Sequence, residues 1–276
     1  MDITSVTSFR RATSRADLSL SPGEVVMAGG TWLMSEPQPD TTGFVDLMGL
    51  DWPDLEVSDE GLRISATCTI ATLVAWSRGE TEVPVPSVWT AAAVIPDAAN
   101  ALLASFKIWN TATVGGNICR SFTAASMVSL TATLDGIGVI WTPDGGERRE
   151  PIAQFVTGQG TNTLAPGEVM RAIDIPAHAL RSRAVIHKVA LAELGRSGVV
   201  VSARQDEDDS TTFVATAATL TPHVLRYAGI PKADVLAADV AGASDFYSDP
   251  LGEADWRQGV SVVLAERCRA DLEGAR

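Results

Sequence analysis

The chain has 276 residues, of which 46% are hydrophobic and 20% charged, and its 34 acidic and 21 basic side chains give a formal net charge of −13. This length allows one large domain or two modest ones, and no apolar run approaches the roughly 20 residues that span a bilayer. The negative charge argues against nucleic acid or an anionic membrane as partner, because phosphate neutralisation requires clustered Lys and Arg.

The first part of the chain predicts short strands and one capped helix. The apolar runs Glu24–Ala28 and Phe44–Leu47 and the alternating run Gly61–Ala66 are typical of strands. Thr69 can cap a helix in which Ile70, Leu73 and Val74 share one face. The basic residues near the start have no apolar stretch behind them, so we expect no secretory signal and a cytoplasmic globular protein.

Helices dominate the next segment. Two short helices are predicted over Val88–Ile95 and Asp97–Phe106, with Pro96 separating them, and a third has an apolar face of Met127, Leu130 and Leu134. Gly138–Thr142 and the ERREP segment flank the turn sequence Pro143–Gly146, which predicts a hairpin. This mixture, without strict βαβ alternation, favours an α+β fold.

The character of the sequence changes near Glu168. The segments VMRAIDIP, AVIHKVAL, GVVVSARQ and TTFVATAATL predict the strands of one antiparallel sheet, and QDEDDS predicts an exposed turn between two of them. Apolar residues at helical spacing over Glu253–Leu272 predict a helix packed on that sheet. We therefore expect two domains, 1–170 and 171–276.

Two glycine-rich loops are the strongest chemical signal. The first is Ala28-Gly29-Gly30-Thr31, directly after a predicted strand, and the second is Thr113-Val114-Gly115-Gly116-Asn117. Glycine pairs permit positive φ and close backbone approach, and successive amides in such turns form a concavity that binds anions. An acidic protein that binds a diphosphate needs this device, because its side chains supply no positive pocket. Either loop alone could be an ordinary turn, and neither matches the GxGxxG or P-loop pattern.

For the other candidate residues we favour an ordinary structural role. Gly158-Gln159-Gly160 lacks the third glycine of a dinucleotide motif and predicts a plain loop. No GxSxG motif supports hydrolase chemistry. The three histidines lack metal-ligand spacing and are expected on the surface or on strands, and the three cysteines fit neither a disulfide framework nor a CxxC site: His178, His187 and His223; Cys68, Cys119 and Cys268. Cys119 follows the second loop, and packing is the favoured role for it.

The string AGGTWL (Ala28–Leu33), followed later by NTATVGGNI (Asn110–Ile118), resembles the FAD-binding subunits of the molybdenum hydroxylases. That family includes the flavin subunits of xanthine dehydrogenase and of aerobic carbon monoxide dehydrogenase, whose members read AGGTDL and IRNxATIGGNI. GLRISATCT, TNTLAPGEVMRAIDIP and VIHKVAL resemble further segments of the family. The resemblance therefore covers nearly the whole chain.

The resemblance implies a two-domain flavoprotein in which an N-terminal PCMH-type α+β domain holds FAD between its glycine loops. A C-terminal antiparallel-sheet domain with a helix would close over the flavin. The backbone of the first loop would cradle the diphosphate, through Ala28, Gly29, Gly30, Thr31, Trp32 and Leu33. The second motif would hold the phosphates and ribityl chain, through Asn110, Thr113, Gly115, Gly116 and Asn117. Met170 would make an apolar contact to the flavin, and Lys188 would lie near its ring.

Three residues depart from the family pattern. Trp32 replaces an aspartate, Trp109 replaces an arginine, and Ser126 replaces the carboxylate that usually hydrogen-bonds the cofactor. An indole at residue 32 can pack on an aromatic ring, and a serine at residue 126 can still make a single hydrogen bond. We therefore list Ser126 with the candidate cofactor residues and expect altered FAD affinity or flavin potential.

The function that the resemblance implies is electron relay. In such complexes a large molybdopterin subunit hydroxylates the substrate, a small subunit with two [2Fe–2S] clusters passes the electrons on, and the flavin subunit delivers them to NAD⁺, O₂ or a quinone. The expected assembly is a dimer of heterotrimers. Three scattered cysteines cannot ligate clusters that need about four thiolates each. We assign no catalytic side chain and no metal ligand to this chain.

Two other functions stay open at this point. Replacement of the family's carboxylates at Trp32 and Ser126 could leave a flavin-free subunit that only bridges its partners in the assembly. A stand-alone flavin oxidase with its own substrate pocket is the third hypothesis. The chain is short for such an enzyme and offers no catalytic base near the loops.

Overall fold

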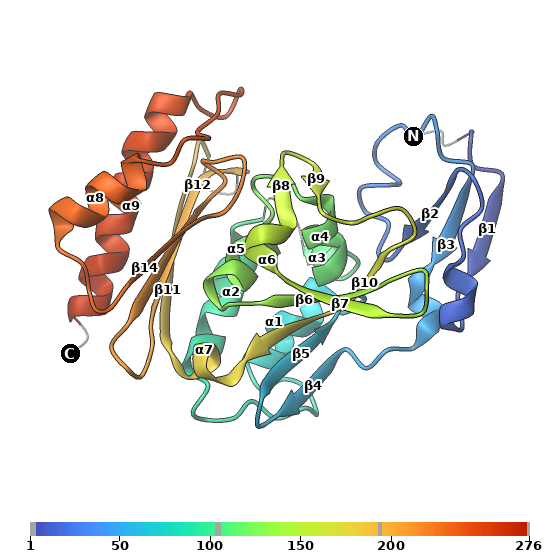
Figure 1. Ribbon diagram of the computed structural model, residues 1–276, viewed down its shortest axis with the longest axis horizontal. Helices are drawn as coiled ribbons and strands as arrows, with labels where there is room; N and C mark the ends of the chain where they lie inside the picture. Colours follow the sequence, from blue (N-terminus) through green and yellow to red (C-terminus); the bar gives the residue numbers. More distant parts are fainter. Residues whose placement is uncertain (1–3, 103–105, 193–194, 275–276) are drawn as a thin grey trace.

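The computed structural model describes residues 4–102, 106–192 and 195–274 and arranges them in three neighbouring parts (Figure 1). A small sheet lies at one end, a mixed α/β region occupies the middle, and a sheet covered by two helices lies at the other end. The α+β class predicted from the sequence is confirmed.

The small N-terminal sheet is parallel and sets the position of the first glycine loop. It contains β1 (Ser8–Arg11), β3 (Gly43–Asp46) and β2 (Glu24–Met27), in that order. Two short 3₁₀ helices, η1 (Arg15–Leu18) and η2 (Leu47–Leu50), follow β1 and β3 in the chain. The strands predicted at Glu24–Ala28 and Phe44–Leu47 are confirmed with a shift of one residue at their ends.

A five-stranded antiparallel sheet forms the floor of the middle region. Its order is β4 (Leu55–Ser58), β5 (Gly61–Ser65), β10 (Val169–Pro176), β6 (Ile137–Trp141) and β7 (Glu147–Pro151). The predicted hairpin is confirmed, since Trp141 pairs with Glu147 across the Pro143–Gly146 turn. A separate two-stranded ribbon, β8 (Val156–Gly158) and β9 (Thr161–Asn162), lies beside it.

The prediction that VMRAIDIP joins the C-terminal sheet is wrong. This segment is β10, which pairs with β5 on one side and β6 on the other in the middle of the first domain's sheet. Its buried side chains on both faces fit a central strand, whose neighbours a local pattern does not specify. We therefore propose to move the domain boundary from residue 170 to the short helix α7 (Ala177–Arg181) that follows β10.

The middle region also contains several helices, of which α4 and α6 contact the sheet directly: α1 (Ile70–Ser77), η3 (Thr90–Val94), α2 (Ile95–Asn100), α3 (Phe106–Trp109), α4 (Val114–Arg120), α5 (Ser126–Thr133) and α6 (Ile152–Phe155). The Thr69 cap is confirmed, because its Oγ1 accepts a hydrogen bond from Thr72 N at 3.0 Å. The prediction that Pro96 separates two helices is wrong. Pro96 lies in the first turn of α2, where backbone N–H groups have no acceptor within the helix, so the missing N–H of proline costs no hydrogen bond. Part of the helix predicted over Asp97–Phe106 falls on residues 103–105, outside the described residues.

The C-terminal sheet is antiparallel, as predicted, with the order β11 (Arg183–Ala190), β12 (Ser197–Gln205), β13 (Thr211–Thr216) and β14 (His223–Tyr227). The acidic turn connects β12 to β13. Helices α8 (Ala233–Ala241) and α9 (Ala254–Gly274) cover the outer face of the sheet (Figure 1). The predicted C-terminal helix is therefore confirmed.

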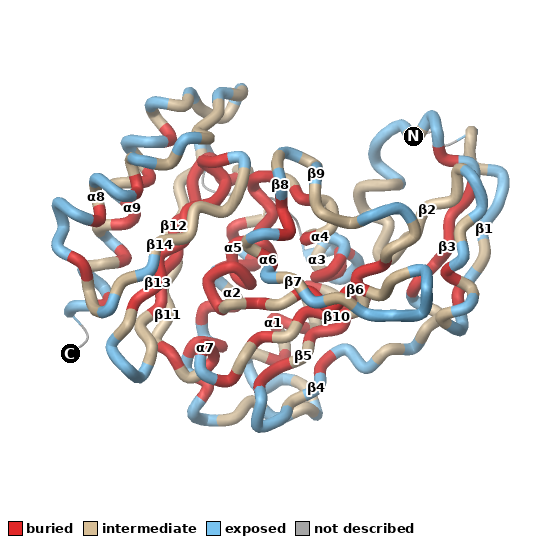
Figure 2. Tube along the Cα trace, in the orientation of Figure 1, coloured by how far each residue is buried: buried red, intermediate tan, exposed pale blue. Residues whose placement is uncertain are grey.

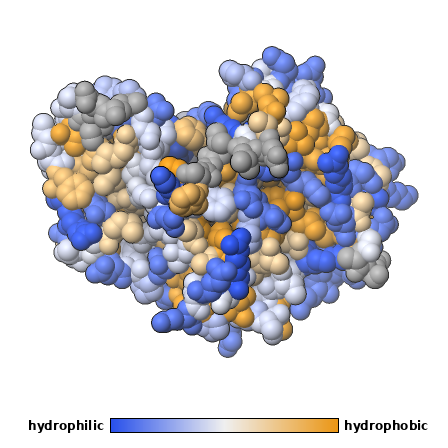
Figure 3. Space-filling view, turned by 180° about the vertical axis from the view of Figure 1, so that it is seen from behind, coloured by the Kyte–Doolittle hydropathy of each residue, from blue (hydrophilic) through white to orange (hydrophobic). Residues whose placement is uncertain are grey.

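Buried residues form two main cores, one in the middle region and one between the C-terminal sheet and α9 (Figure 2). Helix α5 lies between them, and all eight of its residues are buried because its other face packs on β12 and β13. Seen from behind, the surface mixes apolar and hydrophilic residues (Figure 3). Among the described residues, none of the helices combines the length and apolar composition that a membrane span requires.

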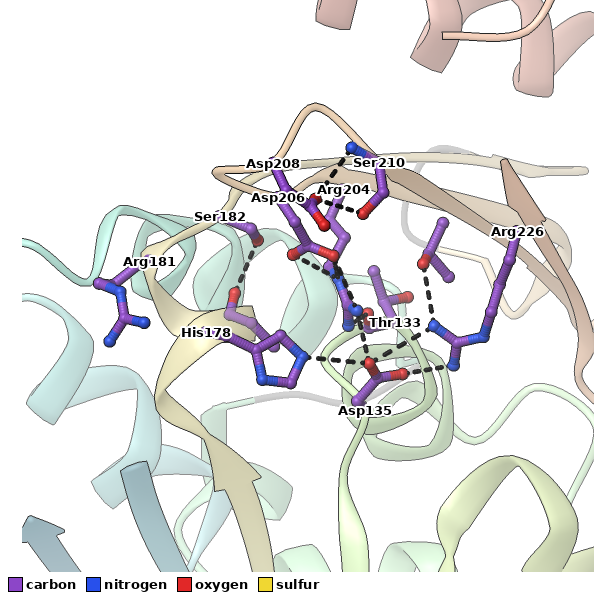
Figure 4. A network of polar contacts seen from close by, with 12 residues as sticks. Thr133, Asp135, His178, Arg181, Ser182, Arg204, Asp206, Asp208, Ser210 and Arg226 are labelled. Atoms are coloured by element: carbon purple, nitrogen blue, oxygen red, sulfur yellow. Dashed lines mark hydrogen bonds and ion pairs between the residues drawn. The ribbon is translucent and has the colours of Figure 1, made fainter. Parts of the chain in front are cut away.

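A polar network joins the two domains at the end of α5 (Figure 4). Asp135 accepts hydrogen bonds from Arg204 of β12 at 2.5 Å and from Arg226 of β14 at 2.6 Å. His178 of α7 approaches the same carboxylate at 3.4 Å. Arg204, whose side chain is 1% exposed, also donates to Thr133 O at the end of α5. The network therefore holds the C-terminal sheet at a fixed position against the first domain.

Candidate cofactor site

A cavity of about 820 Å³ opens between the first glycine loop, α4, the start of β10 and the segment before β12. Its volume lies in the range of small-molecule and cofactor sites. Residues of both predicted motifs line it, together with the predicted apolar contact: Ala28, Gly29, Gly30, Thr31, Trp32, Leu33, Thr113, Gly115, Gly116, Asn117 and Met170. The two loops, distant in sequence, therefore face one space.

The first loop presents free backbone donors to this cavity. Within the described residues, the amides of 29–33 donate no backbone or side-chain hydrogen bond. Gly30 has φ +65°, and Gly29 lies so close to the segment just before the second loop that an added Cβ would be 1.7 Å from Thr111 O. Glycine is required at both places, for conformation at one and for space at the other. The result is a row of unpaired N–H groups of the kind that binds anions.

The second loop has fewer free amides than the first. Its amides already have acceptors: Val114 N donates to Cys68 O at 2.9 Å, and Gly115 N donates to Ala66 O at 3.1 Å. Thr113 caps α4, with its Oγ1 accepting from Gly116 N at 3.1 Å. A Cβ on Gly115 would lie 2.4 Å from the Ala66 Cβ. This loop is therefore closely packed against its neighbours, and cofactor contact by Thr113, Gly115 and Gly116 stays a prediction.

Asn117 lines the cavity and also contacts helix α5. Its Oδ1 accepts a hydrogen bond from Met127 N at 3.0 Å, which holds the first turn of α5. No partner of its Nδ2 occurs within the described residues, so this group remains a donor for a ligand.

Three predicted residues do not line the cavity. Asn110 is exposed at the end of α3. Ser126 is 1% exposed, and its buried Oγ has no partner among the described residues. The Lys188 Nζ donates to Asn100 O at 2.7 Å and thereby ties β11 to the end of α2. Cofactor contact by these three residues stays a prediction.

The sequence did not single out two further cavity residues, Arg120 and Phe122. The Arg120 Cζ lies 3.7 Å from the Trp32 ring centroid and 4.1 Å from that of Phe122. Trp32 therefore packs on a guanidinium in this structure. The replacement of the family's aspartate by Trp32 was the only signal in the sequence that pointed to this cluster.

The remaining candidates have structural surroundings. Cys119 lines the cavity, but burial raises the pKa of its thiol to about 12, so the thiol is neutral and a poor nucleophile. Burial also raises the pKa of Cys68 and Cys268. The expectation for the histidines is confirmed, since His187 and His223 lie on strands and His178 is exposed on α7.

The sequence matches a family model described as the FAD binding domain in molybdopterin dehydrogenase over residues 4–178. The chain belongs to this family. It is 30% identical over 178 residues to the xanthine dehydrogenase FAD-binding subunit of Escherichia coli O157:H7. That alignment covers 61% of this chain and 57% of the relative, so the chain matches little more than half of the length of the curated relative.

Solved structures share the fold over nearly the whole chain. Reconstituted CO dehydrogenase from Oligotropha carboxidovorans has a TM-score of 0.81 at 20% identity, covering 98% of this chain and 99% of that chain. Quinoline 2-oxidoreductase from Pseudomonas putida 86 has a TM-score of 0.76 at 19% identity, covering 96% and 95%. These likenesses extend through the C-terminal sheet, beyond the residues that the family model matches.

The site fits FAD. The free amides of the first loop suit a diphosphate, and the apolar side chains of Met170 and Leu164 suit a flavin or adenine ring. Asn117 adds a side-chain donor. The cavity therefore offers a place for each chemical part of the dinucleotide.

Replacing Ser126 tests whether its hydroxyl touches FAD. A buried hydroxyl without a partner lowers the stability of the fold. We therefore expect the free energy of unfolding of Ser126→Ala to lie between about 0.5 kcal/mol below and about 1 kcal/mol above the wild-type value. Because Ser126 does not line the cavity, we expect FAD affinity to stay unchanged, which would count against the contact predicted from the sequence. Urea unfolding and a flavin fluorescence titration measure both quantities.

Ser129→Ala is the matched control, because Ser129 is equally buried and its hydroxyl bonds Thr216 Oγ1. It should lower the free energy of unfolding by about 1 kcal/mol. A loss of FAD affinity above about tenfold in Ser126→Ala would contradict the expectation and make Ser126 a cofactor ligand.

Proposed function

We propose that this chain is the FAD-binding electron-transfer subunit of a molybdenum hydroxylase complex. The observation that carries the proposal is the row of unpaired amides at 29–33 facing a cavity of dinucleotide size, in a chain of the FAD-binding family. When bound, FAD accepts electrons and passes them on, which is chemistry that no side chain supplies. The residues of this chain bind it, orient it and exclude water.

In this proposal, different residues of the cavity contact different parts of FAD. The first loop holds the diphosphate through the amides of 29–33, and Asn117 Nδ2 donates to the polar chain of the dinucleotide. Met170 lines the cavity from β10 with its side chain buried beside Gly138, and we propose that it contacts the flavin ring from there. No general acid or base is needed for electron relay.

The electrons would come from a partner. We propose that a small subunit with two [2Fe–2S] clusters delivers them and that a large molybdopterin subunit oxidises the substrate. The three cysteines of this chain are unpaired and separate, and two are fully buried, which leaves cluster ligation to the partner. The proposed assembly is a cytoplasmic dimer of heterotrimers that reduces NAD⁺, O₂ or a quinone.

Co-expression with both partners tests the proposal. The purified complex should contain one FAD per copy of this chain after acid extraction, and the flavin absorbance should bleach when the substrate of the complex is added. An assembled complex without flavin contradicts the proposal and favours the flavin-free assembly subunit. Steady turnover by the isolated chain would instead favour a stand-alone oxidase.

A further inference from the structure

The guanidinium of Arg120 sits in a corner between two aromatic rings at the edge of the cavity. Trp32 comes from the first glycine loop, Arg120 ends α4, and Phe122 follows it. The two rings meet edge to face, with centroids 6.4 Å apart and planes at 77°. The Arg120 Cζ lies 3.7 Å from one centroid and 4.1 Å from the other. The position of this cation is therefore held by two aromatic rings.

The edges of the same guanidinium have no acceptor. Among the described residues nothing accepts a hydrogen bond from Arg120, and its Nε is fully buried without a partner. Gly160, at φ +74°, lies against the group, since an added Cβ there would be 3.4 Å from Nη1. Burial lowers the pKa of Arg120, and the charge of Glu36 opposes that shift.

Two fully buried arginines of this chain have carboxylate partners, whereas Arg171, which lies over the Trp52 ring, has a buried Nη1 without a partner among the described residues, as Arg120 has a buried Nε. Arg204 bonds Asp135 and Asp206, and Arg257 bonds Asp249 and three backbone carbonyls. An unpaired buried donor costs about 1–3 kcal/mol, and more when it is charged. Arg120 bears this cost inside a ligand cavity, where a bound anion would remove it.

We propose that the guanidinium of Arg120 binds the diphosphate of FAD, held in register by Trp32 and Phe122. The inference rests on the proposed function and adds a specificity-determining residue to it. Stacking uses the faces of a guanidinium, while its N–H donors lie in the plane and stay available to oxygen atoms. The diphosphate is the anionic part of FAD, and Trp32 belongs to the loop whose amides face the same ligand. A planar fork of donors matches phosphate oxygens in geometry and charge.

The charges at the cavity bear on one expectation from the sequence. The net charge of −13 predicted that side chains supply no positive pocket to a diphosphate. Arg120 and Arg196 line the cavity together with the carboxylates Glu36 and Glu168, and the Arg196 Cζ lies 5.7 Å from the centroid of the Phe122 ring. The overall charge of a chain does not describe a single cavity.

The test compares FAD with riboflavin, which carries the same flavin ring but no phosphate. The dissociation constants of both are measured by fluorescence titration of the full-length apo chain. Arg120→Met should weaken FAD binding by about 10- to 100-fold and leave riboflavin binding within about threefold. Arg120→Lys keeps the charge without the planar fork and should fall between wild type and Arg120→Met. Arg78→Met, at an exposed position at the end of α1, is the matched control and should change neither value.

Each outcome decides the inference. Unchanged FAD affinity in Arg120→Met overturns it and leaves the proposed function standing. An equal loss for FAD and riboflavin also overturns it, because Arg120 would then act on the flavin ring. If Arg120→Met does not fold, the ratio of the two affinities in Arg120→Lys decides in the same way. A wild-type complex that assembles without FAD fails the proposed function itself, and the inference with it.

Discussion

Gly29→Ala is expected to remove FAD binding and to destabilise the first domain. An added Cβ would lie 1.7 Å from Thr111 O and 2.7 Å from Thr111 C, both backbone atoms that no side-chain rotation can move away. The first loop must then move away from the backbone of Thr111, and the row of amides loses its position. We expect FAD affinity to fall by at least about 100-fold and the free energy of unfolding to fall by about 3 kcal/mol.

Gly259→Ala is the control for this substitution. Gly259 lies in α9, far from the loops, and an added Cβ would meet nothing within 4 Å. Alanine is the better helix former, so this variant should gain about 0.5–1 kcal/mol and bind FAD normally. Fluorescence titration and urea unfolding measure both variants. Gly29→Ala with wild-type affinity would disprove the close contact of the first loop with Thr111 as the basis of the site.

The sequence alone was sufficient to predict those features of the fold that depend on neighbouring residues in the chain. The Pro143–Gly146 turn defined its hairpin, and Thr69 defined the start of α1 through its own side chain. The family resemblance placed the two glycine loops in one motif set, and residues of both loops line one cavity.

Long-range pairing explains what the sequence did not predict. β10 has the same alternation and β-branched content as the strands that follow it, yet it pairs with β5 and β6. The amides of the second loop are bonded to carbonyls of Ala66 and Cys68, which only the fold brings near. Arg120 was not a candidate for the same reason, since its environment comes from Trp32 of a distant loop. A local sequence pattern does not specify which distant residues lie next to a given residue in the fold.

Asp135→Asn is expected to weaken the junction between the two domains. The carboxylate receives hydrogen bonds from Arg204 and Arg226, and Arg204 is 1% exposed (Figure 4). Removing the charge leaves this buried cation with Asp206 as its carboxylate partner. Loss of one partner from a buried ion pair costs about 3–5 kcal/mol, and we expect about 3 kcal/mol because Asp206 remains. Asn tolerates the left-handed backbone at this position, where φ is +52°, so the loss isolates the charge.

Glu207→Gln is the control, because it breaks the surface pair of Arg181 with a carboxylate that is 64% exposed. This variant should lose no more than about 1 kcal/mol in urea unfolding. An equally small loss in Asp135→Asn would show that the network does not hold the domains together.

The pH dependence of the Asp135 effect gives a second and independent measurement. Burial alone would raise the pKa of Asp135, but hydrogen bonds from Arg226 and Arg204 outweigh it and lower the pKa from 3.8 to about 2. A lowered carboxylate pKa stabilises the fold above the unfolded-state value, and that contribution disappears as the pH falls through the folded-state value. The difference in free energy of unfolding between wild type and Asp135→Asn should therefore be complete above about pH 4 and shrink toward pH 2. A difference that stays constant over this interval would mean that the ionised carboxylate is not what Arg204 requires.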